Sequence, residues 1–230
     1  MTEKTAIVTG AGQGFGLALT AALAQRGNTV IACARDAERL HTATAGLPGV
    51  IAMAGDVTDP GFRAELVGAA GERLDLLVHN AGELGPSPLP TLADYPLDAL
   101  RAVLETTVLG PLAITQLALP LLRASATGTV ITLSSDAAVE AYPGWGGYGA
   151  AKAALDHIAA VLAQEEPLVR VHAFDPGDMR TAMHQRAFPG EDISDRPLPD
   201  TVVPAFLRLL GERPPSGRFR AADLLAGQPA

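Results

Sequence analysis

Three side chains in the second half of the chain have the types and spacing needed for acid–base chemistry on a carbonyl or an alcohol. Tyr148 and Lys152 lie four residues apart in a stretch with helical periodicity, so they share one face of the expected helix. A tyrosine phenol titrates near a pKa of about 10, and a nearby ammonium group lowers that pKa by stabilising the phenolate. Tyr148 is therefore the candidate general acid and base. Ser135 follows an apolar run, and its hydroxyl can polarise a substrate oxygen.

A glycine-rich turn near the start of the chain is a candidate site for a phosphate-bearing cofactor. The stretch from Thr9 to Gly16 lies between an apolar run and a helical stretch, with glycine at positions 10, 12, 14 and 16. Glycine permits a sharp turn, and its missing side chain allows a pyrophosphate to approach the helix N-terminus. The spacing differs from the Gly-x-Gly-x-x-Gly pattern of dinucleotide sites. The turn predicts cofactor binding, with a flexible strand–helix connection as the alternative.

Short apolar runs alternate with Ala/Leu-rich helical stretches and would position these groups. We predict strands over Thr5–Thr9, Thr29–Ala34, Val50–Met53, Leu74–His79, Gly128–Ser134 and Leu168–Phe174. We predict helices over Leu17–Arg26, from an Asp36 cap to Thr44, over Phe62–Ala70, over Leu97–Leu122 with interruptions at Pro111 and Pro120, and over Tyr148–Gln164. The strands are continuous Val/Ile/Leu runs, which is typical of a sheet covered on both faces. The pattern predicts an α/β fold, a doubly wound parallel sheet in a three-layer α/β/α arrangement.

Length, composition and charge narrow the class of protein. The 230 residues fit one domain, taken as 1–230, and 48% hydrophobic residues are enough for a buried core. A net charge of −8 with no basic run disfavours nucleic-acid binding. Cys33 is the single cysteine and no zinc-ligand spacing occurs, so we expect neither a disulfide nor a metal. With no signal-like leader and no apolar run of roughly 18 residues, we expect a cytoplasmic protein without a membrane span.

The order of the motifs resembles that of the short-chain dehydrogenase/reductase family. The Thr9–Gly16 turn, the tetrapeptide His79-Asn-Ala-Gly82, and Ser135 placed 13 residues before the Tyr148-x-x-x-Lys152 pair follow the family's order. The resemblance covers essentially the whole chain, including the Asp175-Pro-Gly177 turn. It implies a Rossmann fold and a nicotinamide-dependent oxidoreductase. Such an enzyme interconverts a small-molecule ketone or aldehyde and an alcohol by hydride transfer.

The resemblance also implies roles for individual residues. Lys152 would bond the nicotinamide ribose, and Asp56 would accept the adenine amino group, although Asp56 also suits the cap of the next helix. The implied catalytic set is Ser135, Tyr148, Lys152 and Thr107. The implied cofactor-binding set is Gly10, Gln13, Gly14, Phe15, Gly16, Arg35, Asp56, Val57, Asn80, Ala81, Gly82, Tyr148, Lys152, Pro176, Gly177, Met179 and Thr181. Thr107 stands where the family usually has an asparagine that helps hold a water, so the proton relay is open to question.

The end of the second strand distinguishes NADP from NAD. An acidic side chain there accepts the ribose hydroxyls and repels a 2′-phosphate, whereas an arginine does the reverse. Ala34 occupies the acidic position, Arg35 follows it, and Arg39 lies one helical turn further. This order resembles the NADP-preferring pattern, so we predict NADP(H), with NAD as the less favoured alternative. Asp36 is the competing ribose ligand, and we interpret it as a helix cap.

The substrate end of the chain is less defined by the sequence. We expect a substrate wall made of Asp136, Glu140, Tyr142, Trp145, Met183, His184 and Phe188. Residues 184–200 form the longest irregular stretch, and long loops are often lids, so we expect a lid over about residues 178–200. The wall is mixed in polarity and does not name a substrate.

Two further expectations concern assembly and an alternative function. The family commonly pairs the helices around Leu104–Leu122 and Tyr148–Gln164 across a two-fold axis, which predicts a homodimer or homotetramer. The alternative function is a non-catalytic sensor of nicotinamide nucleotides on the same fold. Only Thr107 supports that alternative, and the Ser135, Tyr148 and Lys152 set opposes it.

Overall fold

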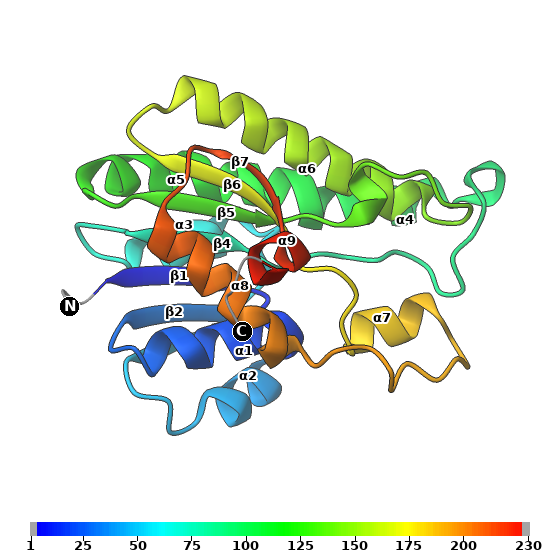
Figure 1. The fold of residues 1–230 in the computed structure, drawn as a ribbon, viewed down its shortest axis with the longest axis horizontal. Helices are drawn as coiled ribbons and strands as arrows, with labels where there is room; N and C mark the ends of the chain where they lie inside the picture. The colour runs from blue at the N-terminus through cyan, green and yellow to red at the C-terminus, as the bar shows by residue number, and fades with distance from the viewer. Residues whose placement is uncertain (1–3, 227–230) are drawn as a thin grey trace.

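Seven parallel strands form one sheet in the order β3-β2-β1-β4-β5-β6-β7 (Figure 1). The structure, a computed structural model, describes residues 4–226. The strands are β1 (Thr5–Thr9), β2 (Thr29–Ala34), β3 (Val50–Ala54), β4 (Leu76–His79), β5 (Thr129–Leu133), β6 (Arg170–Asp175) and β7 (Gly217–Arg220). The chain winds outward from β1 to β3 and then returns to β4 on the other side of β1. The crevice between the carboxyl ends of β1 and β4 is therefore the topological switch point, where open α/β sheets bind ligands.

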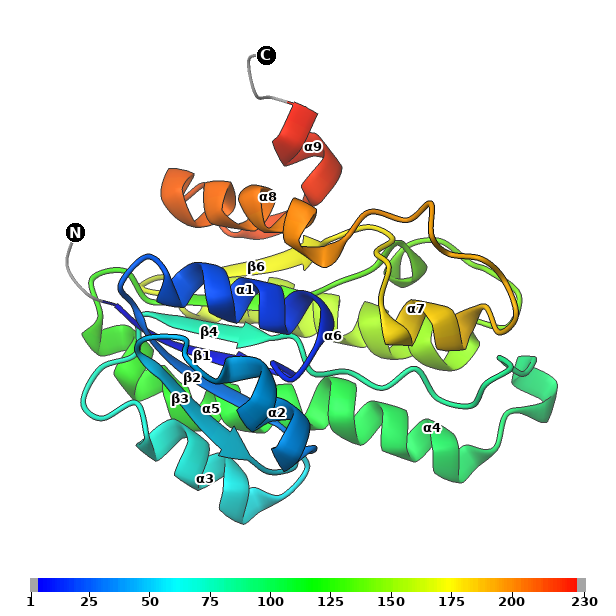
Figure 2. The same cartoon turned by 90° about the horizontal axis from the view of Figure 1, so that it is seen from below.

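Helices cover both faces of the sheet, as the continuous apolar strands predict. The helices α1 (Gly14–Ala24), α2 (Ala37–Thr44) and α8 (Pro199–Glu212) contribute to one core cluster, and α3 (Pro60–Gly68), α5 (Gly110–Ala124) and α6 (Gly146–Glu165) contribute to the other. Ile7 and Val8 are adjacent in β1 yet belong to different clusters, because successive strand side chains point to opposite faces. The predicted doubly wound, three-layer α/β/α fold is confirmed, and Figure 2 shows helices on both sides of the sheet.

The long helical stretch after β4 differs in one respect from the prediction. It consists of α4 (Leu97–Leu104), a π-helical turn over Glu105–Leu109, and α5. Pro111 does not interrupt this stretch and lies in the first turn of α5, directly after the π-helical turn. Pro120 lies inside α5 without ending it. The departure from α-helical geometry is the π-helical turn, and turns of this kind are frequent at functional sites.

The segment after β6 is more ordered than the sequence suggests. The predicted irregular stretch 184–200 begins inside the short helix α7 (Ala182–Ala187), and Pro199 opens α8. Thr181 caps α7 by accepting the His184 N–H at 3.1 Å. Figure 2 shows α7 beyond the carboxyl ends of the strands. The chain then adds the four-residue edge strand β7 and the helix α9 (Ala221–Ala226).

One continuous helical stretch of the described residues has the length and apolar composition of a membrane span. It runs over Leu97–Ala124, the α4, π-turn and α5 region, with a mean hydropathy of 1.5 in its most apolar window. Of that window, 44% is buried inside the structure, against α3 and α6 among other elements. The stretch reaches this length because the helix continues through both prolines, and charged and polar side chains interrupt its apolar sequence.

Candidate active site

Two adjoining cavities lie at the carboxyl ends of the strands. The first has a volume of about 300 Å³ and is lined by the β1–α1 turn, the end of β2, residues 55–57 and residues 80–82. The second has a volume of about 350 Å³ and is lined by residues 134–137, the start of α6, residues 175–179 and α7. Met179, Thr181 and Met183 line both cavities. A ligand that extends from the first cavity past these residues reaches the second.

Close packing within the protein, rather than a ligand, explains some of the glycines in the β1–α1 turn. Gly10 has a φ of +67°, and a Cβ there would lie 2.8 Å from Asn80 Nδ2. A Cβ on Gly16 would collide with the same amide and with the carbonyl oxygen of Gly10. Gly14, with a φ of +58°, lines the first cavity and has ordinary clearance, its Cβ position lying 3.5 Å from Thr181. Close packing of the turn on β4 therefore explains Gly10 and Gly16, whereas Gly14 is left to face a ligand.

The start of the 80–82 segment is fastened to the glycine turn by hydrogen bonds. The Asn80 side-chain amide donates to the carbonyl oxygens of Thr9 and Gly10, both at 2.9 Å. The Thr9 hydroxyl accepts the backbone N–H groups of Asn80 at 3.1 Å and of Ala81 at 3.0 Å. These bonds fix the carboxyl ends of β1 and β4 relative to each other, so the first cavity has a rigid floor.

The end of β2 places two arginines at the rim of the first cavity. Arg35 is largely exposed and lies 3.5 Å from the Glu83 carboxylate, and Arg39 donates to the Gln13 side-chain oxygen at 2.8 Å. Asp36 caps α2 by accepting the Arg39 N–H at 3.0 Å, as predicted from its sequence context. Ala34 supplies no charge. Two arginines therefore lie at this rim, Arg35 beside the Glu83 carboxylate and Arg39 at 3.5 Å from the Asp36 carboxylate.

Asp56 also lines the first cavity, although one part of its interpretation was wrong. Its carboxylate accepts the backbone N–H and the hydroxyl of Thr58, both at 2.9 Å, and so forms a local turn. The cap of α3 is Asp59, which accepts the Gly61 N–H at 2.8 Å. The acidic residue next to Pro60, rather than the one after the strand, starts the helix, because proline is favoured in the first helical turn.

Ser135 and Tyr148 both line the second cavity, while Lys152 lies behind them. Lys152 is 4% exposed, and its ammonium donates to the Leu133 carbonyl oxygen. Its Nζ lies 5.5 Å from the centroid of the Tyr148 ring. Burial lowers the pKa of Lys152 to about 8, and the charges of Asp156 and Asp175 partly oppose this shift. The structure therefore brings the three side chains of the predicted catalytic set together.

The pKa of Tyr148 shifts in the direction opposite to the prediction. Burial raises the pKa of this phenol well above its ordinary value, a hydrogen bond with Ser135 opposes the shift, and the carboxylates of Asp136, Asp175 and Asp156 add to it. Lys152 is not among the groups that lower this pKa, although its Nζ lies 5.5 Å from the ring centroid. In this structure the phenol is a proton donor at neutral pH.

Thr107, the fourth residue of the set, is fully buried in the π-helical turn. Its hydroxyl accepts the Glu83 N–H at 3.2 Å. A Cβ built on Gly82 would lie 3.8 Å from both Thr107 Oγ1 and Lys152 Nζ, so the two groups flank this glycine. Thr107 thus lies near Lys152, but its hydroxyl already has a backbone partner.

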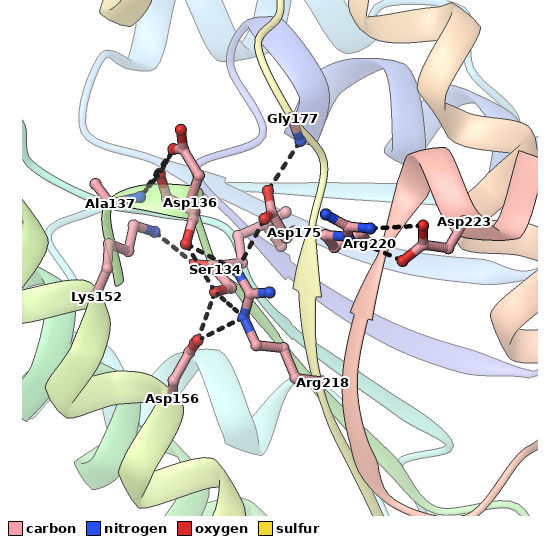
Figure 3. Close-up of polar contacts among 12 residues, drawn as sticks. Ser134, Asp136, Ala137, Lys152, Asp156, Asp175, Gly177, Arg218, Arg220 and Asp223 are labelled. Carbon is pink, nitrogen blue, oxygen red and sulfur yellow. Dashed lines mark hydrogen bonds and ion pairs between the residues drawn. The ribbon is translucent and has the colours of Figure 1, made fainter. Parts of the chain in front are cut away.

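A network of charged side chains supports the strand ends behind Ser135 and Lys152 (Figure 3). Arg218 of β7 contacts the carboxylates of Asp156 at 3.2 Å and Asp175 at 2.8 Å, and donates to the Ser135 carbonyl oxygen at 2.9 Å. The Ser134 hydroxyl donates to Asp156 at 2.6 Å. Four segments therefore meet at one guanidinium group: the end of β5, α6, the end of β6, and β7.

Little in the sequence predicts this network. Asp156 follows Lys152 by four residues, and this spacing predicts that the two side chains share one face of a helix. Arg218 lies in a polar segment more than 60 residues away, and only the pairing of β7 with β6 brings it to the site. No local pattern links an edge-strand arginine to a helix carboxylate.

Comparison with known proteins identifies the family to which this chain belongs. The family described as short chain dehydrogenase matches residues 4–192. The chain belongs to the short chain dehydrogenase family. The uncharacterized oxidoreductase YciK of Escherichia coli strain K12 is 30% identical over 227 residues, which cover 92% of this chain and 88% of the relative. The L-fucose dehydrogenase of Bos taurus is 34% identical over 189 residues, covering 78% of this chain and 67% of the relative.

Solved structures of family members superpose closely on this short chain dehydrogenase. A member from Shigella flexneri 2a, complexed with NADP, has a TM-score of 0.88 at 29% identity and covers 96% of this chain and 98% of its own. A member from Escherichia coli CFT073, complexed with NADPH, has a TM-score of 0.86 at 30% identity and covers 96% of this chain and 97% of its own. The predicted family membership is confirmed, and the protein is an oxidoreductase of this type.

Most of the residues predicted to bind cofactor lie at the two cavities of this dehydrogenase. The first cavity is lined by Gly10, Gln13, Gly14, Phe15, Arg35, Asp56, Val57, Asn80, Ala81, Gly82, Met179 and Thr181. The second is lined by Tyr148, Pro176 and Gly177, besides Met179 and Thr181. Gly16, Lys152 and Thr107 line neither cavity. Phe15 has its ring in the core, 6.0 Å from Phe174, so only a small part of it is exposed to the cavity.

The predicted substrate wall is largely present, with one exception. Asp136, Tyr142, Trp145, Met183, His184 and Phe188 line the second cavity. Glu140 does not line it and is exposed. Leu84, Ala137, Asp175, Asp178 and Ala187 complete the wall, and the sequence prediction missed them as wall residues. Leu84 comes from the segment after β4, so only tertiary packing brings it there.

Proposed function

We propose that this protein is an NADP(H)-dependent carbonyl reductase or alcohol dehydrogenase with Tyr148 as general acid and base. The observation that carries the proposal is the meeting of Ser135 and Tyr148 in a cavity that adjoins a nucleotide-sized cavity at the switch point. Family members complexed with NADP and NADPH support the choice of cofactor.

The residues of the first cavity fit a phosphorylated dinucleotide. Gly14 leaves room at the N-terminus of α1, where backbone N–H groups and the helix dipole favour an anion. Arg35 and Arg39 lie at the end of β2, Ala34 supplies no opposing charge, and Asp36 is engaged as a helix cap. A 2′-phosphate would meet two exposed arginine side chains here, so NADP(H) is favoured over NAD(H).

The mechanism assigns one task to each catalytic side chain. When bound, NADPH supplies the hydride that reduces the carbonyl carbon. Ser135 donates a hydrogen bond to the carbonyl oxygen, and Tyr148 transfers its phenolic proton to that oxygen, so the product is a neutral alcohol. Lys152 stabilises the resulting phenolate by its charge until a proton returns from solvent. The raised pKa of the Tyr148 phenol keeps the proton in place until the oxygen becomes basic.

The test is a panel of ketones and aldehydes with NADPH, followed by the loss of absorbance of the reduced cofactor. We expect at least one class of carbonyl compound to consume NADPH, with less turnover with NADH. Tight binding of NADPH without turnover of any ketone, aldehyde or alcohol would contradict the enzyme assignment and favour the nucleotide sensor.

We further propose that the protein assembles through α5 and α6. Leu109, Leu117 and Val161 are large apolar side chains exposed by 47%, 45% and 41%, on the end of the π-helical turn, on α5 and on α6. A second copy would cover them, giving a homodimer or homotetramer. Sedimentation at micromolar concentration measures this directly, and a mass equal to the 23.6 kDa chain would contradict it.

A further inference from the structure

The second cavity combines a row of aromatic rings with carboxylates. Trp145 contacts Tyr148 edge to face with ring centroids 5.7 Å apart, and it lies 5.9 Å from the Phe188 ring. Phe188 in turn lies 4.9 Å from the His184 ring. The row extends from the catalytic phenol to α7. The faces of such rings carry negative potential and attract cations.

All the formal charges that line this cavity are negative, apart from any carried by His184. Asp136, Asp175 and Asp178 line it, and no lysine or arginine of the described residues does. Asp175 is paired with Arg218, and Asp178 lies 3.6 Å from Arg196. Asp136 forms no ion pair with a lysine or arginine within residues 4–226. One carboxylate therefore faces the cavity without a cationic partner.

Asp136 is held in place by neutral donors. Its carboxylate accepts the Ser135 hydroxyl at 2.9 Å, the Ala137 N–H at 2.8 Å and the Tyr142 hydroxyl at 3.2 Å. These bonds orient the carboxylate without neutralising its charge. It is the residue next to Ser135, so a ligand oxygen at Ser135 places the rest of the ligand close to this charge.

The nearby cations are committed elsewhere. Lys152 bonds the Leu133 carbonyl, Arg218 bridges Asp156 and Asp175, and Arg186 bonds Glu83 at 3.1 Å. His184 has a side chain that is only 10% exposed, and its Nε2 has no hydrogen-bond partner among the described residues.

We propose that the substrate of this site is a carbonyl compound or alcohol that carries a cationic nitrogen, with Asp136 as its counter-ion and Trp145 and Phe188 as its aromatic wall. The inference rests on the proposed carbonyl–alcohol chemistry and names the class of substrate for it. Carboxylates and phosphates are excluded from the class, because no cation of the cavity wall would compensate their charge.

The same arrangement links the charge of the substrate to the reaction. The negative charge of Asp136 opposes ionisation of the Tyr148 phenol. A substrate cation beside Asp136 offsets that charge, so it favours phenolate formation when the proton is transferred. A neutral substrate leaves the opposing charge in place.

Binding can be tested without turnover, because Trp145 is the only tryptophan of the chain and lines the cavity. We would titrate the protein, saturated with NADP, with choline, with its neutral carbon analogue 3,3-dimethylbutan-1-ol, and with the anion 3,3-dimethylbutanoate, following tryptophan fluorescence. We expect choline to bind roughly three- to tenfold more tightly than the neutral analogue, and the anion to bind least. In the Asp136→Asn variant, the three compounds should no longer differ in affinity in this order. The Asp178→Asn variant is the matched control and should keep it, since Arg196 already neutralises that carboxylate.

Turnover separates this inference from the proposed function. The substrates are 4-acetyl-N,N,N-trimethylanilinium, 4-tert-butylacetophenone and 4-acetylbenzoate, each with NADPH. Because the para substituents also change the reactivity of the carbonyl, the readout is the ratio of kcat/KM for the cationic ketone to that for the neutral ketone. A ratio that falls in Asp136→Asn supports the inference. A ratio that is the same in wild type and Asp136→Asn overturns it and leaves the carbonyl chemistry intact. Charge-ordered binding with no turnover of any carbonyl compound supports the cation site and instead contradicts the proposed reaction.

Discussion

The cavity at the end of β1 and β2 and the cavity at the end of β5 and β6 adjoin each other, yet different kinds of group build them. The first takes its floor from the backbone of one turn, fixed by Asn80 and Thr9 through bonds to main-chain atoms. The second takes its shape from side chains of separate segments, and Arg218 joins four of them. A backbone site is encoded by a short motif, whereas a site of charged side chains depends on long-range packing. Substitutions at the second cavity should therefore change turnover and the stability of the fold. Substitutions at the first cavity should change which cofactor binds.

The largest effect is expected for Tyr148→Phe, at the second cavity. This change removes the hydroxyl and keeps the ring, so the contact with Trp145 survives. Turnover should fall by roughly 10²–10⁴-fold, the usual loss for a general acid. Steady-state kinetics measure the fall, and a cofactor titration provides the control, because NADPH affinity should change little. Near-normal turnover would mean that another residue supplies the proton.

Arg218→Met tests the support behind that cavity. The guanidinium is 27% exposed, and its loss leaves the buried carboxylates of Asp156 and Asp175 without their arginine partner. The free energy of unfolding should fall by about 3 kcal/mol, the lower end of the range for breaking a buried pair. Denaturant unfolding measures it.

The matched control for Arg218 is two residues away in the same strand. Arg220→Met removes an arginine that is also bonded to a carboxylate, that of Asp223, but in an exposed position. Exposed pairs contribute little, so its unfolding midpoint should stay near that of the wild type. Equal losses in the two variants would show that the network does not support the fold.

Acid should destabilise the protein through His79, which is buried at the end of β4. Burial lowers the pKa of His79 to about 3, from a model-peptide value near 6.5. Between these two values the unfolded chain binds a proton that the folded chain does not, so stability falls as pH decreases from about 6.5 toward 3. The expected slope is up to about 1.4 kcal/mol per pH unit for this residue.

His79→Asn should make the unfolding free energy less dependent on pH between pH 6 and pH 4. An asparagine side chain does not titrate, and it keeps a polar group near the Thr115 hydroxyl, which lies 2.8 Å from His79 Nε2. Exposed His41 on α2 provides the control, since His41→Asn should leave the slope unchanged. A slope that is the same in wild type and His79→Asn would exclude His79 as the source.

The smallest effect is expected at the first cavity, for Arg35→Ala. Arg35 is 63% exposed, so losing its contact with a 2′-phosphate should cost about 1.5 kcal/mol, roughly tenfold in Kd. The affinity for NADH should not change, because NADH lacks that phosphate. Equilibrium titrations with both cofactors measure the ratio, with Arg26→Ala, an exposed arginine in the turn after α1, as the control. Equal affinities of the wild type for NADPH and NADH would contradict the predicted preference.

The sequence alone determined the features that depend on neighbours along the chain. The six predicted strands all exist, with ends within two residues of their predicted positions, because buried parallel strands are continuous apolar runs. The glycine turn and the Tyr148-x-x-x-Lys152 pair could be predicted for the same reason, because a turn and a helix face each depend on a few consecutive residues. The position of Ser135 could be predicted because it follows the end of a strand.

Tertiary structure decided the features that depend on distant residues or on burial. The strand β7 is too short and too polar to be recognised, yet its pairing with β6 brings Arg218 to Asp156. The rise in the Tyr148 pKa follows from desolvation and from the nearby carboxylates of Asp136, Asp175 and Asp156, and spacing along a helix specifies neither. Charge spacing is visible in a sequence, but the dielectric environment and the partners of a charge exist only once the chain has folded.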